Sequence, residues 1–356
     1  MKIKQIRCWR KDLKLTRPYE IAFKKIDVVE NIFVSIHLEN GIIGVGSGNP
    51  SYEVTGENLS QTEQIISDFI NSHILEGLDI RNFFSLIKIL KRYFINRPAA
   101  MAAIDIALHD CFGKYLNVSI VDMYGRQKKA IATSVTIGIK NSEETIEEAK
   151  EFVQAGFKIL KVKLGHDLKI DIERLIKLRE IFKNIKIRVD ANQGYSIEET
   201  NKFLELSENL HLELVEQPVP TAQFPIAVIK KHLKKIAADE SIINLKDAIR
   251  LVTSPVGCFI YNIKLMKCGG ISAAMEIANI GDLSNVQLMW GCNDESIISI
   301  TAALHAAYSN KNTAYIDLDG SFDLINDVVS DGFMLKDGML YLTDGIGLGV
   351  SNLNLN

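Results

Sequence analysis

The fold assignment depends on one stretch of the sequence, Leu160-Lys161-Val162-Lys163-Leu164-Gly165. Its apolar residues predict a buried β-strand, yet it carries lysines at positions i and i+2, which strand geometry places on one face. Two neighbouring ammonium groups repel each other and resist burial, so a plain core strand does not explain them. Taken alone, the stretch is typical of a strand whose end reaches solvent. The rest of the chain favours a different interpretation.

The composition is that of a globular protein with enough apolar residues for a large core. The chain has 356 residues, of which 47% are hydrophobic and 24% are charged. Its 41 basic and 44 acidic residues give a net charge of −3, which does not favour binding to nucleic acid or to a membrane surface. We find no signal peptide and no run of about 20 apolar residues, so we expect a cytoplasmic protein. The five cysteines include no C-x-x-C pair, so neither a disulfide framework nor a zinc site is predicted.

Three regions of different pattern follow one another along the chain. Residues 1–125 combine strand-like alternation with a later helical segment, which predicts an α+β domain. Within this region, residues 15–27 lack periodicity and are interpreted as a long loop. Residues 126–321 alternate short β-rich runs with amphipathic helices. The tail, residues 322–356, has only short strand-like runs, and we expect it to return to the first domain.

Eight strand candidates recur between residues 126 and 321 at a steady spacing. They are 131–137, 159–164, 185–190, 212–216, 235–239, 259–264, 286–290 and 314–318. Successive candidates begin roughly 23 to 28 residues apart, which is enough for one strand, one helix and two loops. Eight such units predict a closed parallel β/α barrel rather than an open sheet.

Polar residues stand at the C-terminal ends of these strands, where barrel enzymes hold their chemistry. Three consecutive strands end in a carboxylate, namely Asp190, Glu216 and Asp239. Converging carboxylates repel one another unless a divalent cation holds them, and ligand sets made of oxygen favour Mg²⁺. Any one of these residues is explained equally well as the cap of the following helix. Three in succession favour the metal.

Lysines flank the three carboxylates, because Lys163 precedes them and Lys264 follows on the sixth strand. A substrate carboxylate at Mg²⁺ would have one lysine on each face of its α-carbon, where the two can serve as base and acid in a proton transfer. A lysine base must be neutral, and a like charge beside it favours the neutral form. We predict that role for Lys161.

Five separated motifs together resemble the enolase superfamily, in its muconate-lactonising subgroup. They are Lys161-Val162-Lys163, Asp190-Ala191-Asn192, Glu216-Gln217-Pro218, Asp239-Glu240-Ser241 and Ile263-Lys264-Leu265. The resemblance covers nearly the whole chain. It implies a (β/α)7β TIM-like barrel formed by residues 126–321, with an α+β capping domain built from residues 1–125 and the 322–356 tail. It also implies Mg²⁺ on the three carboxylates, the flanking lysines as acid and base, and a homo-oligomer.

Within that subgroup, Asp317-Leu318-Asp319 resembles dipeptide epimerases, in which this Asp-x-Asp binds the α-ammonium group of the substrate. Two carboxylates suit a cation, which muconate and succinylbenzoate lack. A solvated turn is the other interpretation of Asp317 and Asp319. The resemblance implies an isomerase that performs a 1,1-proton transfer at the α-carbon of the C-terminal residue of a dipeptide. L-Ala-D/L-Glu, a product of murein peptide breakdown, is the expected substrate.

Four further positions concern the substrate by the same resemblance. Lys24 lies in the 16–27 loop, which the family uses as a lid, and matches an arginine that pairs with a glutamate side chain. Lysine keeps the charge but loses the bidentate fork. Thr136 matches a threonine that contacts substrate, and Cys292 is expected to line the site rather than act as a nucleophile. Asp294 is expected either to touch the dipeptide amine or to reject an acidic side chain.

Two alternatives stay open at this point. An N-acylamino acid racemase or an o-succinylbenzoate synthase would share the scaffold, but its substrate would leave Asp317 and Asp319 without a partner. A non-catalytic barrel that binds peptides or anions would need neither the lysine pair nor the metal ligands. EDTA-sensitive activity distinguishes an enzyme from such a binding protein.

Overall fold

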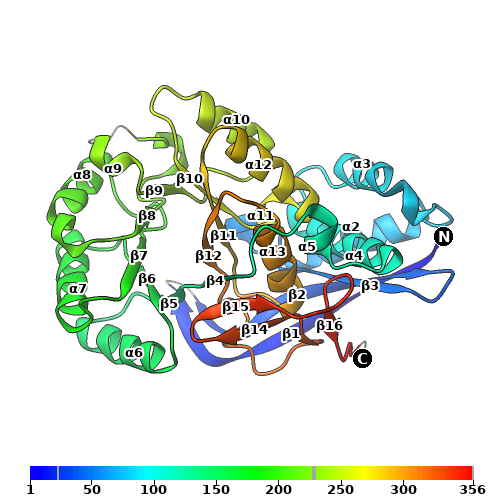
Figure 1. The fold of residues 1–356 in the computed structure, drawn as a ribbon, viewed down its shortest axis with the longest axis horizontal. Helices are drawn as coiled ribbons and strands as arrows, with labels where there is room; N and C mark the ends of the chain where they lie inside the picture. The colour runs from blue at the N-terminus through cyan, green and yellow to red at the C-terminus, as the bar shows by residue number, and fades with distance from the viewer. Residues whose placement is uncertain (22–23, 227–229, 355–356) are drawn as a thin grey trace.

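The computed structural model describes residues 1–21, 24–226 and 230–354, apart from the side chains of residues 18–21, 24–26, 230 and 231. A barrel lies beside a smaller layer of sheet and helices (Figure 1). The smaller layer contains the strands β1 (Ile3–Ile21), β2 (Lys24–Leu38) and β3 (Ile43–Gly48). Its helices are α1 (Tyr52–Thr55), α2 (Leu59–Asn71), η1 (Ile80–Asn82), α3 (Phe83–Tyr93), α4 (Pro98–Leu116) and α5 (Ile120–Tyr124).

We call the smaller layer, β1 to β3 with α1 to α5, the capping layer. Its sheet is buried on both faces, which explains the long apolar run in β2. Ile32, Val34 and Ile36 belong to a core shared with α2, α3 and α4. Phe33 and Val45 belong to the large core that continues into the barrel. The capping layer and the barrel are therefore held together by shared apolar burial.

Glycines on β3 allow α4 to approach the capping sheet closely. Gly44, Gly46 and Gly48 alternate along the strand, so they lie on one face. A Cβ atom at Gly44 or Gly46 would overlap backbone carbonyl oxygens of the alanine-rich α4. The glycines of this segment therefore serve packing.

Eight parallel strands form the barrel in chain order, which confirms the predicted fold. They are β5 (Val135–Ile137), β6 (Ile159–Lys163), β7 (Lys186–Asp190), β8 (Leu214–Glu216), β9 (Ile236–Ala238), β10 (Ile260–Ile263), β11 (Gln287–Gly291) and β12 (Thr313–Asp317). Thr133 and Ile316 form a parallel bridge, and the amide of Ser134 donates to Ile316 O at 3.3 Å. The residues that lead into β5 thus lie beside β12, and the sheet is nearly closed.

Helices alternate with these strands around the barrel (Figure 1). They are α6 (Ser142–Gln154), α7 (Leu168–Ile181), α8 (Ile197–Leu206), η2 (Glu208–Leu210), η3 (Thr221–Gln223), α9 (Lys230–Leu233), α10 (Leu245–Thr253), α11 (Leu265–Cys268), α12 (Ile271–Leu283) and α13 (Ile297–Tyr308). Asn141 and Ser196 begin α6 and α8 with capping boxes completed by Glu144 and Glu199. Such caps satisfy backbone N–H groups that the first helical turn leaves unpaired.

The tail beyond β12 contacts both domains. The strands β14 (Phe333–Lys336) and β15 (Met339–Leu342) form an antiparallel sheet with β4 (Ala130–Ala132), and β13 (Ser330–Asp331) pairs with β16 (Val350–Ser351). The predicted single strand 131–137 is therefore wrong, because β4 joins the tail and only β5 joins the barrel. The amide of Ile325 donates to Lys14 O at 2.9 Å, which joins the tail to the capping sheet.

The predicted loop at residues 15–27 is also wrong. β1 extends to Ile21 and β2 starts at Lys24, so this region is a long antiparallel hairpin. A register shift between Lys14 and Tyr19 breaks the alternation that would have indicated a strand. Pro18 lies in β1 at the edge of its sheet, where the missing N–H is tolerated.

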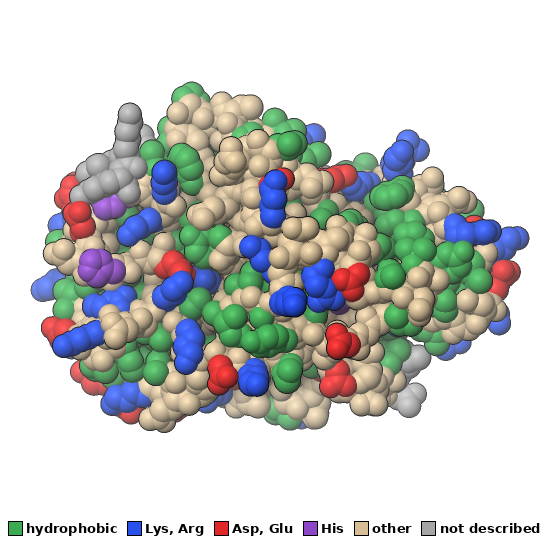
Figure 2. All heavy atoms as spheres, in the orientation of Figure 1, with side chains coloured by type: hydrophobic (Ala, Val, Ile, Leu, Met, Phe, Trp, Pro, Cys, Tyr) green, Lys and Arg blue, Asp and Glu red, His purple; other side chains and the backbone are tan. Residues whose placement is uncertain are grey.

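The surface carries charges of both signs. Figure 2 shows lysine, arginine and acidic side chains interspersed over one face of the molecule. Among the residues that the structure describes, no helix combines the length and apolarity needed to cross a membrane.

Candidate active site and metal centre

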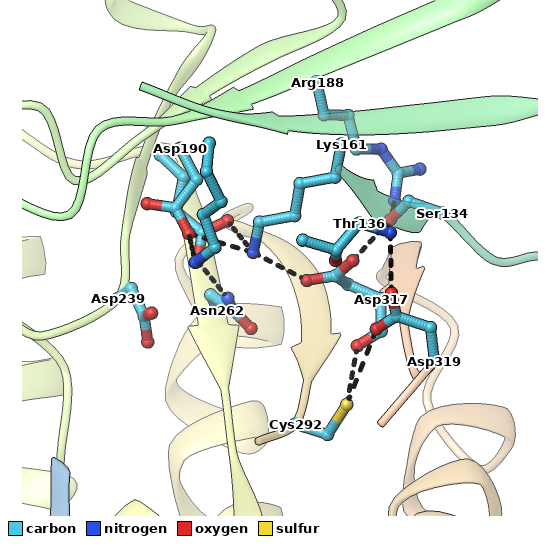
Figure 3. Close-up of polar contacts among 12 residues, drawn as sticks. Ser134, Thr136, Lys161, Arg188, Asp190, Asp239, Asn262, Cys292, Asp317 and Asp319 are labelled. Atoms are coloured by element: carbon cyan, nitrogen blue, oxygen red, sulfur yellow. Dashed lines mark hydrogen bonds and ion pairs between the residues drawn. The ribbon is translucent and has the colours of Figure 1, made fainter. Parts of the chain in front are cut away.

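The first lysine of β6 is buried among carboxylates. The Lys161 side chain is 3% exposed, and its Nζ lies 2.7 Å from Asp317 Oδ2, 2.9 Å from Glu216 Oε2 and 3.0 Å from Asp190 Oδ2. Figure 3 shows Lys161 reaching between Asp190 on one side and Asp317 on the other. Burial lowers the pKa of Lys161, but these carboxylates outweigh burial, and the net pKa lies well above its ordinary value. The unusual lysine of this strand is therefore charged.

Three carboxylates meet at the C-terminal ends of neighbouring barrel strands. The strand register pairs Lys163 with Asp190 and Asp190 with Glu216, and Asp239 follows β9 directly. One oxygen atom of each of the three acidic residues lies within 4.8 Å of the others. The structure thus brings the three ligands predicted from the sequence into one cluster.

The cluster fits a hard divalent cation. Glu216 Oε1 accepts a hydrogen bond from Asn262 Nδ2 at 2.5 Å, whereas Oε2 accepts none from the described residues although Lys161 lies near it. Burial and then the charge of Asp190 raise the pKa of Glu216 to about 8. A cation at this position would stabilise the ionised carboxyl group, and Mg²⁺ prefers such oxygen ligands.

Two lysines from one turn of the chain share Asp239. Lys264 Nζ lies 2.9 Å from Asp239 Oδ2, and Lys267 Nζ forms a close ion pair with Oδ1. Burial raises the pKa of Asp239, but attraction to Lys264 and Lys267 outweighs burial, so the pKa lies well below its ordinary value. Burial lowers the pKa of Lys264, whereas Asp239 raises it, and the net pKa is above its ordinary value. Asp239 is therefore ionised and fixed from two sides.

Lys163 and Lys264 stand on opposite sides of the carboxylate cluster. Lys163 lies on β6 with its Nζ 2.8 Å from Asp190 Oδ2, while Lys264 follows β10 and contacts Asp239. The order of the sheet places β7, β8 and β9 between them. A small molecule bound at the cluster would have one amino group on each side.

A buried hydrogen-bond chain holds Lys161 from the closing strand β12. Asp317 accepts from Lys161 through Oδ2 and from Ser134 Oγ through Oδ1 at 2.6 Å. Arg188 donates to the same Ser134 Oγ at 3.1 Å and to Ile316 O at 2.7 Å. Figure 3 shows these side chains in a row from Arg188 to Lys161. Both oxygens of Asp317 are therefore occupied by donors from the protein.

Asp319 has a different environment from Asp317. Its Oδ2 accepts from the backbone N–H of Thr136 at 2.7 Å, and its Oδ1 lies 4.0 Å from Cys292 Sγ. Burial and then the charge of Asp317 raise the pKa of Asp319 to about 7. Burial, followed by the charge of Asp319, raises the pKa of the Cys292 thiol well above its ordinary value, which disfavours a nucleophilic thiolate. Asp319 is therefore the carboxylate of this pair that an added cation would stabilise most.

The loop after β11 adds two acidic residues to this side of the barrel. Burial raises the pKa of Glu295 to about 7, and the half-buried Asp294 contributes to that rise. Asn293 Nδ2 lies 3.4 Å from Asn49 Oδ1 in the segment after β3, so the capping layer meets the barrel here. The backbone of Lys24 begins β2, but its side chain lies outside the described part of the structure.

The set predicted by sequence leaves out several buried polar residues of the site, among them Arg188, Asn262 and Lys267. Arg188 lies two residues before Asp190, Asn262 lies two before Lys264, and Lys267 lies three after Lys264. Residues two apart in a strand, or three apart in a helical turn, lie on the same side of that element, so each of these residues lies beside one that the sequence predicts. That spacing is the signal by which they could have been found.

Comparison with known proteins gives matches over nearly the whole chain. Residues 4–125 match the mandelate racemase / muconate lactonizing enzyme N-terminal domain, and residues 144–353 match the enolase C-terminal domain-like family. An L-Lys-D/L-Arg epimerase from Desulforapulum autotrophicum is 47% identical over 356 residues, covering 99% of this chain and 100% of that protein. An L-Ala-D/L-Glu epimerase from Clostridium acetobutylicum is 33% identical over 359 residues, with the same coverage of 99% and 100%. The crystal structure of a dipeptide epimerase from Methylococcus capsulatus, complexed with Mg and the dipeptide L-Arg-D-Lys, has a TM-score of 0.95 at 43% identity, covering 99% of this chain and 100% of that one.

Proposed function

This chain belongs to the mandelate racemase / muconate lactonizing enzyme family of the enolase superfamily and is a dipeptide epimerase, and we propose that it prefers dipeptides with cationic side chains. The reaction is supported above all by one arrangement, in which Lys163 and Lys264 flank the three-carboxylate cluster. The side-chain preference is supported by the acidic residues near that cluster and by relatives named L-Lys-D/L-Arg epimerases.

The proposed reaction moves a proton from one face of the substrate α-carbon to the other. One of Lys163 and Lys264 removes the α-proton, and the other returns a proton to the opposite face, with the roles exchanged in the reverse direction. Asp190, Glu216 and Asp239 would hold Mg²⁺, whose positive charge would stabilise the negative charge that develops on the substrate carboxylate.

In this proposal Lys161 binds the substrate carboxylate, and Asp317 holds the Lys161 side chain in place. The ion pair of Lys161 with Asp317 does not involve the metal ligands, so it can persist when those ligands bind a cation. The donors of Lys161 that now face Asp190 and Glu216 would then be available to a substrate carboxylate.

Asp319 is proposed to bind the α-ammonium group of the dipeptide. We expect Asp319→Asn to lower kcat/KM for free dipeptides roughly tenfold to hundredfold. The reason is that one charged hydrogen bond, worth about 1.5–3 kcal/mol, is lost. The same variant should act on N-acetylated dipeptides as the wild type does. Asp317→Asn is the matched control, and it should lower the rate with both substrate classes because Asp317 acts through Lys161. An equal loss for both classes with Asp319→Asn would contradict the assignment.

The preference for cationic side chains follows from the charge on one side of the site. Asp319 and Glu295 both act on the pKa of the Cys292 thiol, and Asp294 acts on the pKa of Glu295, which supports an accumulation of acidic groups there. A lysine or arginine side chain would relieve that accumulation, whereas a glutamate side chain would add to it. The alternative, L-Ala-D/L-Glu, depends on a contact from Lys24.

A dipeptide panel in D₂O tests this preference by the mass change on α-deuteration. We expect kcat/KM for L-Lys-L-Arg to exceed that for L-Ala-L-Glu by roughly tenfold to hundredfold, the effect of one charged contact. Asp294→Asn should reduce the preference, while Lys24→Met should leave it unchanged. Faster turnover of L-Ala-L-Glu than of L-Lys-L-Arg, if it is lost in Lys24→Met, would favour the alternative.

Two further outcomes would favour other functions. Turnover of N-succinyl-arginine equal to that of L-Lys-L-Arg would favour a racemase of N-acylamino acids. Mg²⁺ binding without any exchange of the α-proton would favour a binding protein.

A further inference from the structure

Lys267 is a buried cation that the proposed reaction does not use. Its side chain lies on α11 and is 2% exposed. Its Nζ forms a close ion pair with Asp239 Oδ1 and lies 2.5 Å from Asp239 O and 3.2 Å from Asn262 O. An ammonium group has three donors, so these three oxygens match the hydrogen-bonding capacity of Lys267. The residue therefore acts on the site through Asp239 rather than on a substrate.

This contact gives the two oxygens of Asp239 different environments. Oδ1 is held by Lys267, whereas Oδ2 faces Lys264 Nζ at 2.9 Å. Lys264 and Lys267 are three residues apart across one helical turn, so their side chains reach the same carboxylate. A cation that binds Oδ2 would compete with Lys264 and leave the contact with Lys267 intact.

We propose that Lys267 is a positioning residue that fixes Asp239 as a one-oxygen ligand and thereby favours Mg²⁺ over Ca²⁺. Mg²⁺ demands near-octahedral geometry, whereas Ca²⁺ accepts both oxygens of one carboxylate in a flexible site. With Oδ1 held by Lys267, Asp239 offers only Oδ2. This inference rests on the proposed metal site and is independent of the dipeptide that is bound.

The direction of the effect separates positioning from simple charge. Lys267 places a positive charge beside the metal site, so repulsion alone predicts that its removal strengthens cation binding. Loss of a residue that orients a metal ligand instead weakens metal binding, typically by about 10- to 100-fold. The two explanations therefore predict opposite results for the same variant.

Calorimetric titration of the full-length protein with MgCl₂ and with CaCl₂ tests the proposal. Lys267→Met should weaken Mg²⁺ binding by about 10- to 100-fold and Ca²⁺ binding by less, so the preference for Mg²⁺ falls. Lys267→Arg, which keeps the charge and donors, should restore part of the affinity for Mg²⁺. Lys114→Met is the matched control, because it also removes a lysine that pairs with a buried aspartate, but in the capping layer. Lys114 Nζ contacts Asp110 Oδ2 at 2.7 Å and Ile43 O at 2.8 Å. It should bind both ions as the wild type does.

Two results would overturn the inference: equal or tighter binding of Mg²⁺ by Lys267→Met, or an equal loss for both ions. If circular dichroism shows that Lys267→Met does not fold, Lys267→Gln replaces it with the same expected outcomes, since glutamine keeps a donor without the charge. A wild-type protein that binds no Mg²⁺ would refute the proposed metal site itself. Binding by the wild type with no change of selectivity in the variants would refute only the role of Lys267.

Discussion

Lys163→Ala and Lys264→Ala will each lower the rate of epimerisation by roughly 10²- to 10⁴-fold, the range for loss of a positioned acid or base. The expected cause is that each variant lacks the amino group on one side of the carboxylate cluster. The remaining lysine should still exchange the α-proton of one epimer with solvent without inverting it. Chiral chromatography and the mass change in D₂O measure inversion and exchange separately. The two variants should exchange opposite epimers.

Two controls separate this result from damage to the site. Lys114→Ala removes a lysine that pairs with buried Asp110 in the capping layer, and it should epimerise at the wild-type rate. Calorimetric titration should show that Lys163→Ala and Lys264→Ala still bind Mg²⁺, because the three carboxylates remain. If both variants keep full exchange with either epimer, neither lysine is the base and the proposed two-sided transfer is wrong.

The barrel and the grouping of its carboxylates could be predicted because both follow from local periodicity. Short apolar runs at a steady spacing indicate β/α units, and closure brings the polar residues at their C-terminal ends together. Asp190 and Glu216 end consecutive strands and Asp239 directly follows the next one, so their proximity needs no information about distant pairing. The capping hairpin cannot be predicted in this way, since a register shift after Lys14 removes the period that indicates a strand.

Contacts that depend on closure of the barrel could not be predicted. The sequence predicts that Asp317 and Asp319 bind a substrate amine, but Asp317 is also the partner of Lys161, which lies 156 residues earlier in the chain. That pairing exists only because β12 returns beside the entry to β5. The same closure places Arg188 against Ser134 and Ile316. Local spacing identifies the face on which such residues lie, but the identity of their partners is set by the three-dimensional fold.

Acid will destabilise this protein through His305 as the pH falls from about 6.5 to about 4. His305 lies buried on α13, where Nδ1 accepts from the amide of Val121 at 3.1 Å and Nε2 lies 3.1 Å from Leu348 O. Burial lowers the pKa of His305 to about 4, with a smaller opposing effect from Leu348. In the unfolded chain, His305 takes up a proton at about pH 6.5, whereas in the folded protein it does so only near pH 4. The stabilisation of the folded protein by neutral His305 is therefore complete above about pH 6.5 and is lost as the pH falls toward 4. The loss amounts to roughly 3 kcal/mol.

Urea unfolding at pH 7 and pH 4.5, in EDTA to remove any metal linkage, measures this contribution. His305→Gln keeps a donor toward Leu348, and His305→Asn keeps an acceptor toward Val121, so each preserves part of the buried network. Both variants should be less stable than the wild type at pH 7, but they should lose about 2–3 kcal/mol less on acidification, because neither can take up the proton. His166→Gln, at an exposed position, is the matched control and should parallel the wild type. Parallel curves for the His305 variants and the wild type would refute this role of His305. Asp239 does not account for acid sensitivity between pH 7 and pH 4.5, because its depressed pKa means that its stabilisation is lost only below its ordinary pKa.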